Sequence, residues 1–330
     1  MESGILNRSG ADQRVVLGVD IGGTSAEFGL VDRGGSCLCS GAIPTGAGRP
    51  PGTFFENLCT AARWLREESA PGRILAGVGI GAANANFYTG TIERSPNLGW
   101  DYVDVRAEIG RHLEVPVAVT NDANAAALGE MMFGAARGMR DFIVITLGTG
   151  LGSGIVANGS LVYGADGFAG EIGHTIVDPA GRVCACGRRG CLETYCSATG
   201  LCRTVQELIC DTTLESELRS CSYRDLTARR VSEAAGRGDP LALAAFESCG
   251  DTLGLKLADA VAHVGPEAII LCGGMAAAGD LILRPTRVAM EKYLFPIYRD
   301  KVKLLPSGLG GTNTAVLGAG ALIWNMLGET

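Results

Sequence analysis

The strongest constraint on this sequence is a pattern that occurs twice: an apolar run of strand length, a turn of glycine and threonine, and a second such run. It appears first as RVVLGVD, IGGT and SAEFGLVD from Arg14, and again as DFIVITLGTGLGSGIVANG over Asp141–Gly159. Apolar, β-branched runs on both sides of a glycine turn are typical of a β-hairpin. Two unrelated hairpins would satisfy the same pattern. We interpret the recurrence as a duplicated α/β unit with a cleft between its two copies.

The segments between the two copies support an α/β arrangement. A third strand-like run near Cys37 to Ile43 predicts an antiparallel meander, and apolar residues at helical spacing predict a helix over Thr53–Glu68. Further elements are expected as strands at Ile74–Gly81, Val115–Thr120 and Glu267–Gly274, as helices at about Asp122 to Phe133 and Thr314–Met326, and as largely helical chain over 197–264.

Composition narrows the functional class. The chain has 330 residues, of which 47% are hydrophobic and 19% charged, so it is long and apolar enough for two folded domains. We find neither an apolar run of membrane-spanning length nor a basic-then-apolar leader, and we expect no membrane partner. The net charge of −7 without a basic stripe argues against nucleic acid as a partner. Twelve cysteines in a chain that does not need disulfides indicate a reducing, cytoplasmic location.

Three glycine turns that follow apolar strands are candidate phosphate-binding loops. Glycine allows backbone N–H groups to approach an anion closely, and a neighbouring threonine adds a hydroxyl donor. The candidate residues are Gly22, Gly23 and Thr24, then Thr149 and Gly150, and then Gly273 and Gly274. Asp20 precedes the first turn, where a carboxylate would repel phosphate, so a bound nucleotide would require Mg²⁺ there. The alternative is that Asp20 only caps its own turn.

The segment TNDANAAALGE over Thr120–Glu130 contains a candidate general base. Asn121 and Asp122 stand where a strand gives way to a helix, and capping of the helix would explain one of them. A carboxylate at this position could accept the proton of a substrate hydroxyl group as it attacks phosphorus.

A cluster of one histidine and three cysteines predicts a metal site. His174, Cys184, Cys186 and Cys191 supply four nitrogen and sulfur ligands, which suits a tetrahedral structural Zn²⁺. A disulfide or plain buried thiols are the alternatives. Glu171 and Glu193 flank the cluster as substrate contacts or as ordinary surface acids.

Together these motifs resemble the ROK family of bacterial sugar kinases and repressors. The resemblance rests on DIGGT, TNDANAAALGE, LGTGLGSG, GFAGEIGH, CACGRRGCLE and LCGG, which are collinear over about residues 15–325. It implies an α/β, two-lobed actin/hexokinase-like fold of two RNase-H-like lobes, with sugar and ATP in the central cleft. We expect a small lobe over 14–120 that is completed by a C-terminal helix at 307–330, and a large lobe over 121–306 with the zinc segment.

The resemblance also assigns roles to individual residues. It implies that Asp122 is the general base toward the sugar 6-hydroxyl, and that the glycine turns bind ATP. Sugar contacts would come from Asn121, Glu171, His174 and Glu193, and from Asn84 or Asn86 in the atypical loop GAANANFYTG at 81–90. Ser25 stands where many members have lysine, and Thr120 where many have glutamate.

These features predict an ATP:hexose 6-phosphotransferase with glucose as its substrate, with ATP, Mg²⁺ and structural Zn²⁺ as cofactors, in a homo-oligomer. An N-acetylmannosamine or N-acetylglucosamine kinase is the nearest alternative, since the same motifs serve both. A non-catalytic sugar sensor is an alternative of another class. Only about 14 residues precede the first strand, too few for the DNA-binding domain of the repressor members, so we expect a kinase.

Overall fold

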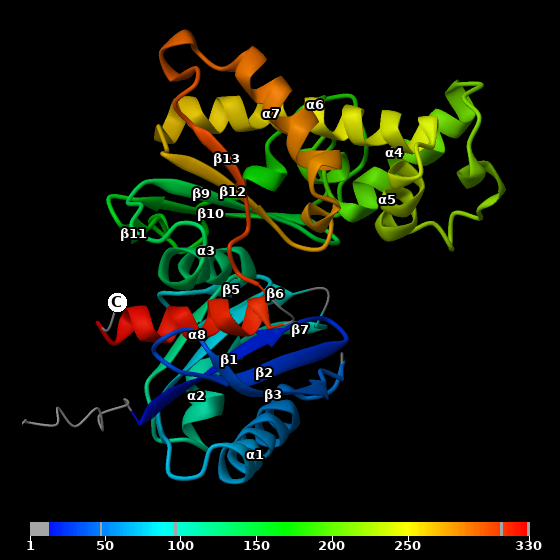
Figure 1. Cartoon of the computed structure of the whole chain (residues 1–330). Coiled ribbons are helices and arrows are strands. Elements are labelled where there is room, and N and C mark those ends of the chain that lie inside the picture. The colour runs from blue at the N-terminus through cyan, green and yellow to red at the C-terminus, as the bar shows by residue number, and fades with distance from the viewer. Residues whose placement is uncertain (1–12, 47, 96–97, 311–312, 329–330) are drawn as a thin grey trace, which may run out of the picture. The chain divides into compact units, whose positions relative to one another are not determined.

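Two compact units make up the chain. The computed structural model describes residues 13–46, 48–95, 98–310 and 313–328. The first unit contains the described residues up to Phe133 together with those from Asn313 onward, and the second runs from Gly134 to Gly310. Each unit is built on one five-stranded sheet (Figure 1). Among the helices of the described residues, none is long and apolar enough to span a membrane.

The sheet of the first unit has the strand order β3-β2-β1-β4-β8. The first three strands are antiparallel neighbours, whereas β4 runs parallel to β1 and β8 runs parallel to β4. This confirms the predicted meander. The strands are β1 (Arg14–Ile21), β2 (Ser25–Val31), β3 (Cys37–Pro44), β4 (Ile74–Ala82) and β8 (Val117–Thr120).

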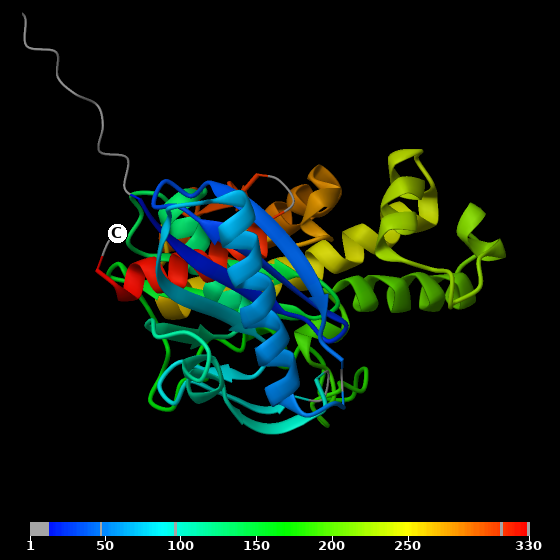
Figure 2. The same cartoon turned by 90° about the horizontal axis from the view of Figure 1, so that it is seen from below.

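Helix α1 (Pro51–Ser69) lies over one face of this sheet (Figure 2). Alternate residues of β1 point toward it, because side chains along a strand alternate between the two faces. Val15 and Leu17 therefore share one buried cluster with Leu58 of α1. Burial of about 25 cal/mol per Å² of apolar surface is the main stabilising contribution at such an interface.

Helix α8 (Thr314–Met326) packs on the opposite face, and two strand glycines allow it to come close (Figure 1). A Cβ atom at Gly18 would overlap the carbonyl oxygen of Val316, and one at Gly79 would overlap that of Ala319. Part of the glycine excess therefore serves helix–sheet packing rather than ligand binding.

Helix α3 (Asp122–Phe133) belongs to the first unit, although our boundary at Asn121 places it in the second lobe. The reason is its packing along α8, where Gly318 faces the carbonyl group of Ala125 without room for a Cβ atom. Chain order does not reveal this contact, because α8 lies at the far end of the sequence.

A small three-stranded sheet and a short helix complete the first unit. They are β5 (Ala85–Asn86), β6 (Thr91–Ser95), β7 (Trp100–Asp104) and α2 (Val105–Gly110). The buried side chain of Asn86 organises the connection after β5, since its Oδ1 accepts hydrogen bonds from the backbone N–H groups of Tyr88 and Thr89.

The sheet of the second unit repeats the order of the first. Its order is β11-β10-β9-β12-β13, with two antiparallel and then two parallel pairings. The predicted duplication of an α/β unit is therefore confirmed. The strands are β9 (Phe142–Leu147), β10 (Leu151–Ala157), β11 (Ser160–Leu161), β12 (Ala268–Cys272) and β13 (Lys303–Pro306).

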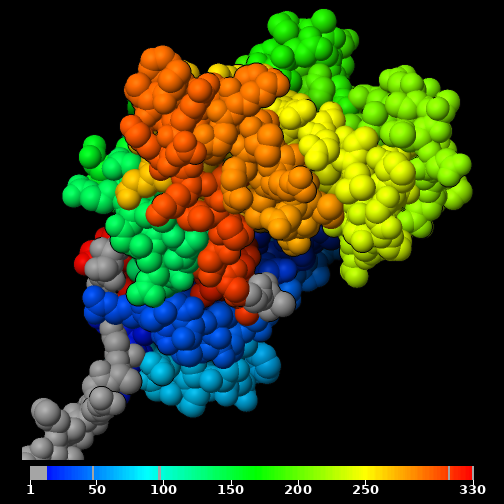
Figure 3. Space-filling view, turned by 45° about the horizontal axis from the view of Figure 1, so that its top comes forward, coloured from blue at the N-terminus to red at the C-terminus, as the bar shows by residue number. Residues whose placement is uncertain are grey.

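The second unit carries more helix than the first. Its α-helices are α4 (Ala198–Asp211), α5 (Ala228–Gly236), α6 (Pro240–Val264) and α7 (Asp280–Tyr293). Short 3₁₀ turns lie at Ile172–His174, Leu192–Thr194, Glu217–Ser220, Ala276–Ala278 and Pro296–Tyr298. The helices α6 and α7, yellow and orange in Figure 3, pack side by side, with Gly250 against Pro285.

Local sequence explains the length of α6. The side chain of Asp239 accepts hydrogen bonds from the first turn, and Pro240 follows it at a position where no N–H donor is needed. Gly265 ends the helix in the left-handed conformation, with φ of 61°, which glycine adopts without a steric penalty.

Candidate functional site

In the first unit, two carboxyl groups lie at the carboxyl ends of neighbouring strands. Asp20 of β1 pairs with Gly81 of β4, and Gly81 pairs with Thr120 of β8. Asp122 begins the helix that follows β8. A Cβ atom built at Gly81 would stand 3.7 Å from Oδ1 of Asp20 and 3.7 Å from Cα of Asp122. The sheet order thus brings together two acids that are far apart in the sequence, with a glycine between them.

Both acids hold their protons more tightly than usual. Burial, together with the nearby carboxylates of Asp122 and Glu27, raises the pKa of Asp20 to about 7. Burial also raises the pKa of Asp122, against the opposing effect of the backbone N–H of Ala123. Asp122 is a solvent-exposed residue, although protein atoms lie around its carboxyl group. Such groups suit proton transfer near neutral pH.

The structure separates the roles of the two residues at the start of α3. Oδ1 of Asn121 accepts a hydrogen bond of 2.7 Å from the backbone N–H of Asn124, which is the bond of a helix N-cap. Asn124 in turn donates to Oγ1 of Thr120 at 3.2 Å. The cap is therefore Asn121, and capping does not account for Asp122.

The remaining predicted residue of the first unit, Asn84, lies in the turn between β4 and β5. It has a φ of 59°, and its Nδ2 donates to the carbonyl oxygen of Arg94 at 2.9 Å. Asn84 thereby stabilises a turn conformation that few residues other than glycine and asparagine adopt. Its exposed position is compatible with a substrate contact but does not require one.

In the second unit, the four predicted metal ligands converge. The ligand atoms of His174, Cys184, Cys186 and Cys191 all lie within 4.8 Å of one another. Cys184 Sγ is 3.8 Å from His174 Nδ1, and the sulfur atoms of Cys186 and Cys191 are 3.6 Å apart. Two sulfur atoms bound to one tetrahedral Zn²⁺ at about 2.3 Å would be separated by about 3.8 Å. The donor set therefore fits zinc, and the sulfur separation is far longer than a disulfide bond.

The metal-binding segment is shaped by two glycines with positive φ. Gly187 and Gly190 have φ of 87° and 72°. At Gly190 a Cβ atom would overlap the carbonyl group of Asp178, so a larger residue would force the backbone at position 190 away from Asp178. Burial raises the pKa of the Cys186 thiol, but hydrogen bonds from Arg188 and from the other thiols lower it to about 6. Cys186 is thus the most acidic of the three clustered cysteines, since the pKa values of Cys184 and Cys191 are raised by burial.

Glu193 joins this segment to the glycine turn between β9 and β10. Its Oε2 accepts a hydrogen bond of 3.1 Å from the backbone N–H of Leu151, and its Oε1 is 3.5 Å from Cys184 Sγ. A Cβ atom at Gly150 would overlap Oε2 of Glu193. The glycine is therefore needed here so that the carboxylate can reach the turn.

Glu171 is held by a buried serine that the sequence did not single out. Ser153 Oγ donates to the carbonyl oxygen of Gly170 and accepts from the backbone N–H of Ile172, so it fixes the residues on both sides of Glu171. Oε2 of Glu171 lies 4.0 Å from His174 Nε2. Ser153 is part of LGTGLGSG, but its two partners are distant in sequence and could not be read from the motif.

The turns at the ends of β9 and β12 lie against each other. The carbonyl groups of Gly148 and Thr149 accept hydrogen bonds from Ala198 and Thr199 at the start of α4, at 2.8 and 2.9 Å. Gly273 has a φ of 92°, and a Cβ atom there would overlap the end of β9 at Leu147. At Gly274 a Cβ atom would meet open space.

The corresponding turn of the first unit is also held through its carbonyl groups. Oγ1 of Thr45 donates to the carbonyl oxygen of Gly22 at 2.7 Å, and the N–H of Thr45 donates to that of Thr24 at 3.0 Å. In both units the carbonyl oxygens are thus fixed by a neighbouring segment. A ligand can therefore approach the backbone N–H groups of these glycine turns.

Comparison with known proteins finds members of one family that are similar over most of the chain. The model of the ROK family matches residues 16–325. A glucokinase of Halalkalibacterium halodurans is 36% identical over 316 residues, which cover 94% of this chain and 95% of the relative.

Two solved structures are similar over most of the chain. A ROK family glucokinase from Streptomyces griseus, in complex with glucose and AMPPNP, has a TM-score of 0.79 and 35% identity, over 93% of this chain and 98% of the other. A ROK family transcriptional regulator, a homologue of the E. coli MLC protein, has a TM-score of 0.86 and 25% identity, over 97% and 80% of the two chains.

Proposed function

The chain belongs to the ROK family, and on this premise we propose that it is an ATP-dependent kinase that phosphorylates the 6-hydroxyl group of glucose. Its two units of equal strand order are the duplicated lobes of an actin/hexokinase-like α/β fold. The observation that carries the proposal is the proximity of the carboxyl groups of Asp20 and Asp122, both of which have a raised pKa. The family resemblance assigns the general base of the reaction to one of them, Asp122.

Asp122 is the proposed general base. Its carboxylate accepts the proton of the sugar 6-hydroxyl as the oxygen attacks the γ-phosphorus of ATP, and the bond to the β-phosphate oxygen breaks. The raised pKa of Asp122 makes it a better proton acceptor than an ordinary aspartate. Because Asn121 supplies the helix cap, the carboxylate of Asp122 is available for this role.

Asp20 is the proposed anchor for Mg²⁺. The residues fit this ion, because the carboxylates of Asp122 and Glu27 lie close enough to Asp20 to raise its pKa, and Mg²⁺ prefers carboxylate oxygens and water. When bound, the ion would neutralise charge on the triphosphate. Without a cation, the carboxylate of Asp20 would repel the phosphates near Gly22, Gly23 and Thr24.

We assign the remaining nucleotide contacts to the second unit. Thr149 and Gly150 would donate backbone N–H groups to phosphate oxygens, while Gly273 and Gly274 would lie against the adenosine. The open space beside Gly274 and the contact of Gly273 with the end of β9 support this assignment, since one ligand could touch both turns.

The metal segment would supply the sugar contacts. The Nδ1 atom of His174 faces the cysteines while its Nε2 faces Glu171, so one ring can serve both zinc and sugar. Glu193 would bind a sugar hydroxyl from its place beside the cluster, and Asn121 and Asn84 would contribute from the first unit. Zinc would be structural here, since all four ligand positions are filled by the protein.

We further propose that the protein is cytoplasmic and forms a homo-oligomer, with neither nucleic acid nor membrane as a partner. None of the described cysteines forms a disulfide, as is typical of a reducing compartment. Val288, Tyr293, Phe295 and Ile297 are each about half exposed near the end of α7, which is typical of an interface between protein chains. Light scattering coupled to size-exclusion chromatography measures the oligomeric state.

A coupled assay of ADP release tests the activity. We expect the highest kcat/KM with glucose, lower values with mannose and with N-acetylated hexosamines, and a product phosphorylated at O6 by nuclear magnetic resonance. A preference for N-acetylmannosamine or N-acetylglucosamine would contradict the substrate assignment. Sugar binding by calorimetry without any ADP release would identify a sensor instead.

A further inference from the structure

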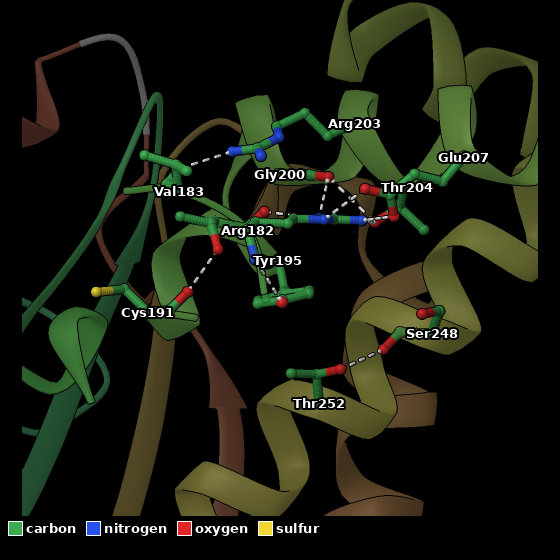
Figure 4. A network of polar contacts seen from close by, with 11 residues as sticks. Arg182, Val183, Cys191, Tyr195, Gly200, Arg203, Thr204, Glu207, Ser248 and Thr252 are labelled. Carbon is green, nitrogen blue, oxygen red and sulfur yellow. Dashed lines mark hydrogen bonds and ion pairs between the residues drawn. The ribbon is translucent and has the colours of Figure 1, made fainter. Parts of the chain in front are cut away.

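Arg182 in the second unit uses every hydrogen-bond donor of its side chain. Its guanidinium group has five N–H donors, and the structure gives it five acceptors. The side chain is only 8% exposed. Its planar group also lies over the ring of Tyr195, 4.4 Å from the centroid (Figure 4). A buried charge with all donors satisfied is fixed in one geometry.

The five acceptors come from two different parts of the unit (Figure 4). Nη1 donates to the carbonyl oxygens of Thr194 and Gly200 at 2.6 and 3.2 Å. Nη2 donates to Oγ1 of Thr204 at 2.9 Å, and the carboxylate of Glu207 accepts from both Nε and Nη2. Thr194 follows Glu193 directly, whereas the other four acceptor atoms belong to three residues of α4.

The backbone of Arg182 belongs to the metal-binding segment. Its carbonyl oxygen accepts from the N–H of Gly190 at 2.8 Å, and its own N–H donates to the hydroxyl group of Tyr195 at 3.1 Å. Cys184 lies two residues further along the chain. One residue therefore connects the metal ligands, the backbone next to Glu193 and the first turns of α4.

The first turn of α4 also holds the glycine turn proposed to bind phosphate. Ala198 and Thr199 donate to the carbonyl oxygens of Gly148 and Thr149. The contacts of Arg182 thus continue through α4 to this turn, and all of them lie within one unit. From the other side, Glu193 reaches the same turn at Leu151.

We propose that Arg182 is a positioning residue that keeps the proposed sugar contact Glu193 and the proposed phosphate turn at 148–150 in a fixed relation. The inference rests on the proposed kinase function. Arg182 touches neither substrate and acts through Thr194 and through α4. Arginine is required because a lysine ammonium has three donors and lacks the planar geometry for two bonds to Glu207.

Arg182→Lys tests the proposal. We expect the KM values for glucose and for ATP to rise together by about tenfold, the size expected when buried hydrogen bonds to a charged group are lost. Zinc content should stay unchanged. The matched control is Arg203→Lys, because the Arg203 side chain donates from α4 to the carbonyl oxygen of Val183 at 3.2 Å and is not a donor to Thr194 or Gly200. Both KM values should remain those of the wild type in the control.

A purely structural role for Arg182 would lower the melting temperature and leave both KM values unchanged, which would overturn the proposal. Glu207→Gln keeps the arginine and removes only the charged acceptor. It should raise the KM values for glucose and ATP together, by a smaller factor than Arg182→Lys. This variant tests the proposal even if Arg182→Lys does not fold. Unchanged KM values in Glu207→Gln would also contradict the proposal.

Thr199→Val separates the two ends of the connection. It removes the hydroxyl donor to Thr149 without touching the metal segment, so only the KM for ATP should rise. A rise for glucose alone would overturn the proposed route through α4. Equilibrium binding of glucose and of a non-hydrolysable ATP analogue is measured on each variant, so positioning is tested even if the wild-type protein shows no turnover. Absent turnover in the wild type would refute the kinase proposal instead.

Discussion

The two units share one sheet order but differ in chemistry at the same strand position. The penultimate residue of β1 is Asp20, whose neighbour on the parallel strand is Gly81. The penultimate residue of β9 is Thr146, whose neighbour on the parallel strand is Cys272. Thr146 accepts a hydrogen bond from Gly152 and closes its own hairpin. A duplicated scaffold thus gives one unit a pair of acids and the other a neutral turn.

Under the proposed function, this difference lets the same backbone meet two needs of phosphoryl transfer. The acids of the first unit suit proton transfer and a cation, whereas the second unit offers glycine surfaces beside a neutral threonine. Substitutions that exchange or remove these features test whether the two units have the separate roles proposed for them.

The largest effect is expected from Asp122→Asn. Loss of the general base should reduce kcat by about 10²- to 10⁴-fold with little change in the KM for glucose. Because burial raises the pKa of Asp122, its ionised form destabilises the folded state at neutral pH, and the variant should melt at the same or a higher temperature. Steady-state kinetics and calorimetry measure both.

The control is Asp280→Asn, which changes the first residue of α7 in the second unit. It should have wild-type kinetics. If Asp122→Asn retained more than about a tenth of wild-type kcat, the assignment of the base to the first unit would be wrong.

Removal of the metal should give the next largest effect. The structural change that it causes should be confined to the second unit. Elemental analysis should find about one zinc ion per wild-type chain and much less in Cys184→Ser. We expect a lower melting temperature and a KM for glucose raised by about tenfold or more, since loss of one ligand typically weakens metal binding strongly. Cys210→Ser, at an exposed cysteine of α4 outside the cluster, should change neither. A fully active protein without metal would refute the zinc site.

Much of this comparison could be predicted from the sequence because its signals are local. The apolar run of α8 predicted Thr314–Met326, and the glycine turns marked both hairpins. The four metal ligands follow one another within a short segment, so their spacing alone was informative.

Features that depend on distant pairing were not predictable in the same way. The proximity of Asp20 and Asp122 requires β4 to lie between β1 and β8, which no local pattern specifies. Arg182 and Ser153 have hydrogen-bond partners that are distant in the sequence, so the sequence gives no sign of their importance. The strands β5 to β7 are short, and the connection that follows β5 is held by the side chain of Asn86, which no apolar periodicity indicates.

A smaller effect, in the first unit, concerns pH. Asp20 binds its proton more tightly when folded, with a pKa of about 7 against a usual value of 3.8. Its contribution to stability is therefore present below pH 4 and is lost as pH rises to about 7, and Asp20→Asn should remove this dependence. The kcat/KM of the wild type should rise with pH to a plateau above about 7, because the ionised form of Asp20 is the one proposed to hold Mg²⁺.

Glu27→Gln sharpens this test. Glu27 faces Asp20 across β1 and β2 and raises its pKa, so the variant should move the acid-side inflection of kcat/KM to lower pH. Thermal melts without nucleotide, from pH 4 to pH 8, measure the stability effect. An inflection that stays near pH 7 in Asp20→Asn would show that another group controls it.

The smallest effect is expected from a single methyl group in the second unit. Gly150→Ala places a Cβ atom on Oε2 of Glu193 and should break the hydrogen bond to Leu151. Gly236→Ala, at the exposed end of α5 in the same unit, meets no atom within 4 Å and is the control. Neither Gly150 nor Gly236 has a positive φ, so neither variant adds backbone strain. We expect a rise of about threefold in the KM values for ATP and glucose for Gly150→Ala alone, since a single neutral donor loses its partner. Equal kinetics in both variants would mean that Glu193 does not connect the metal segment to the turn between β9 and β10. That turn would then bind phosphate without help from the metal site.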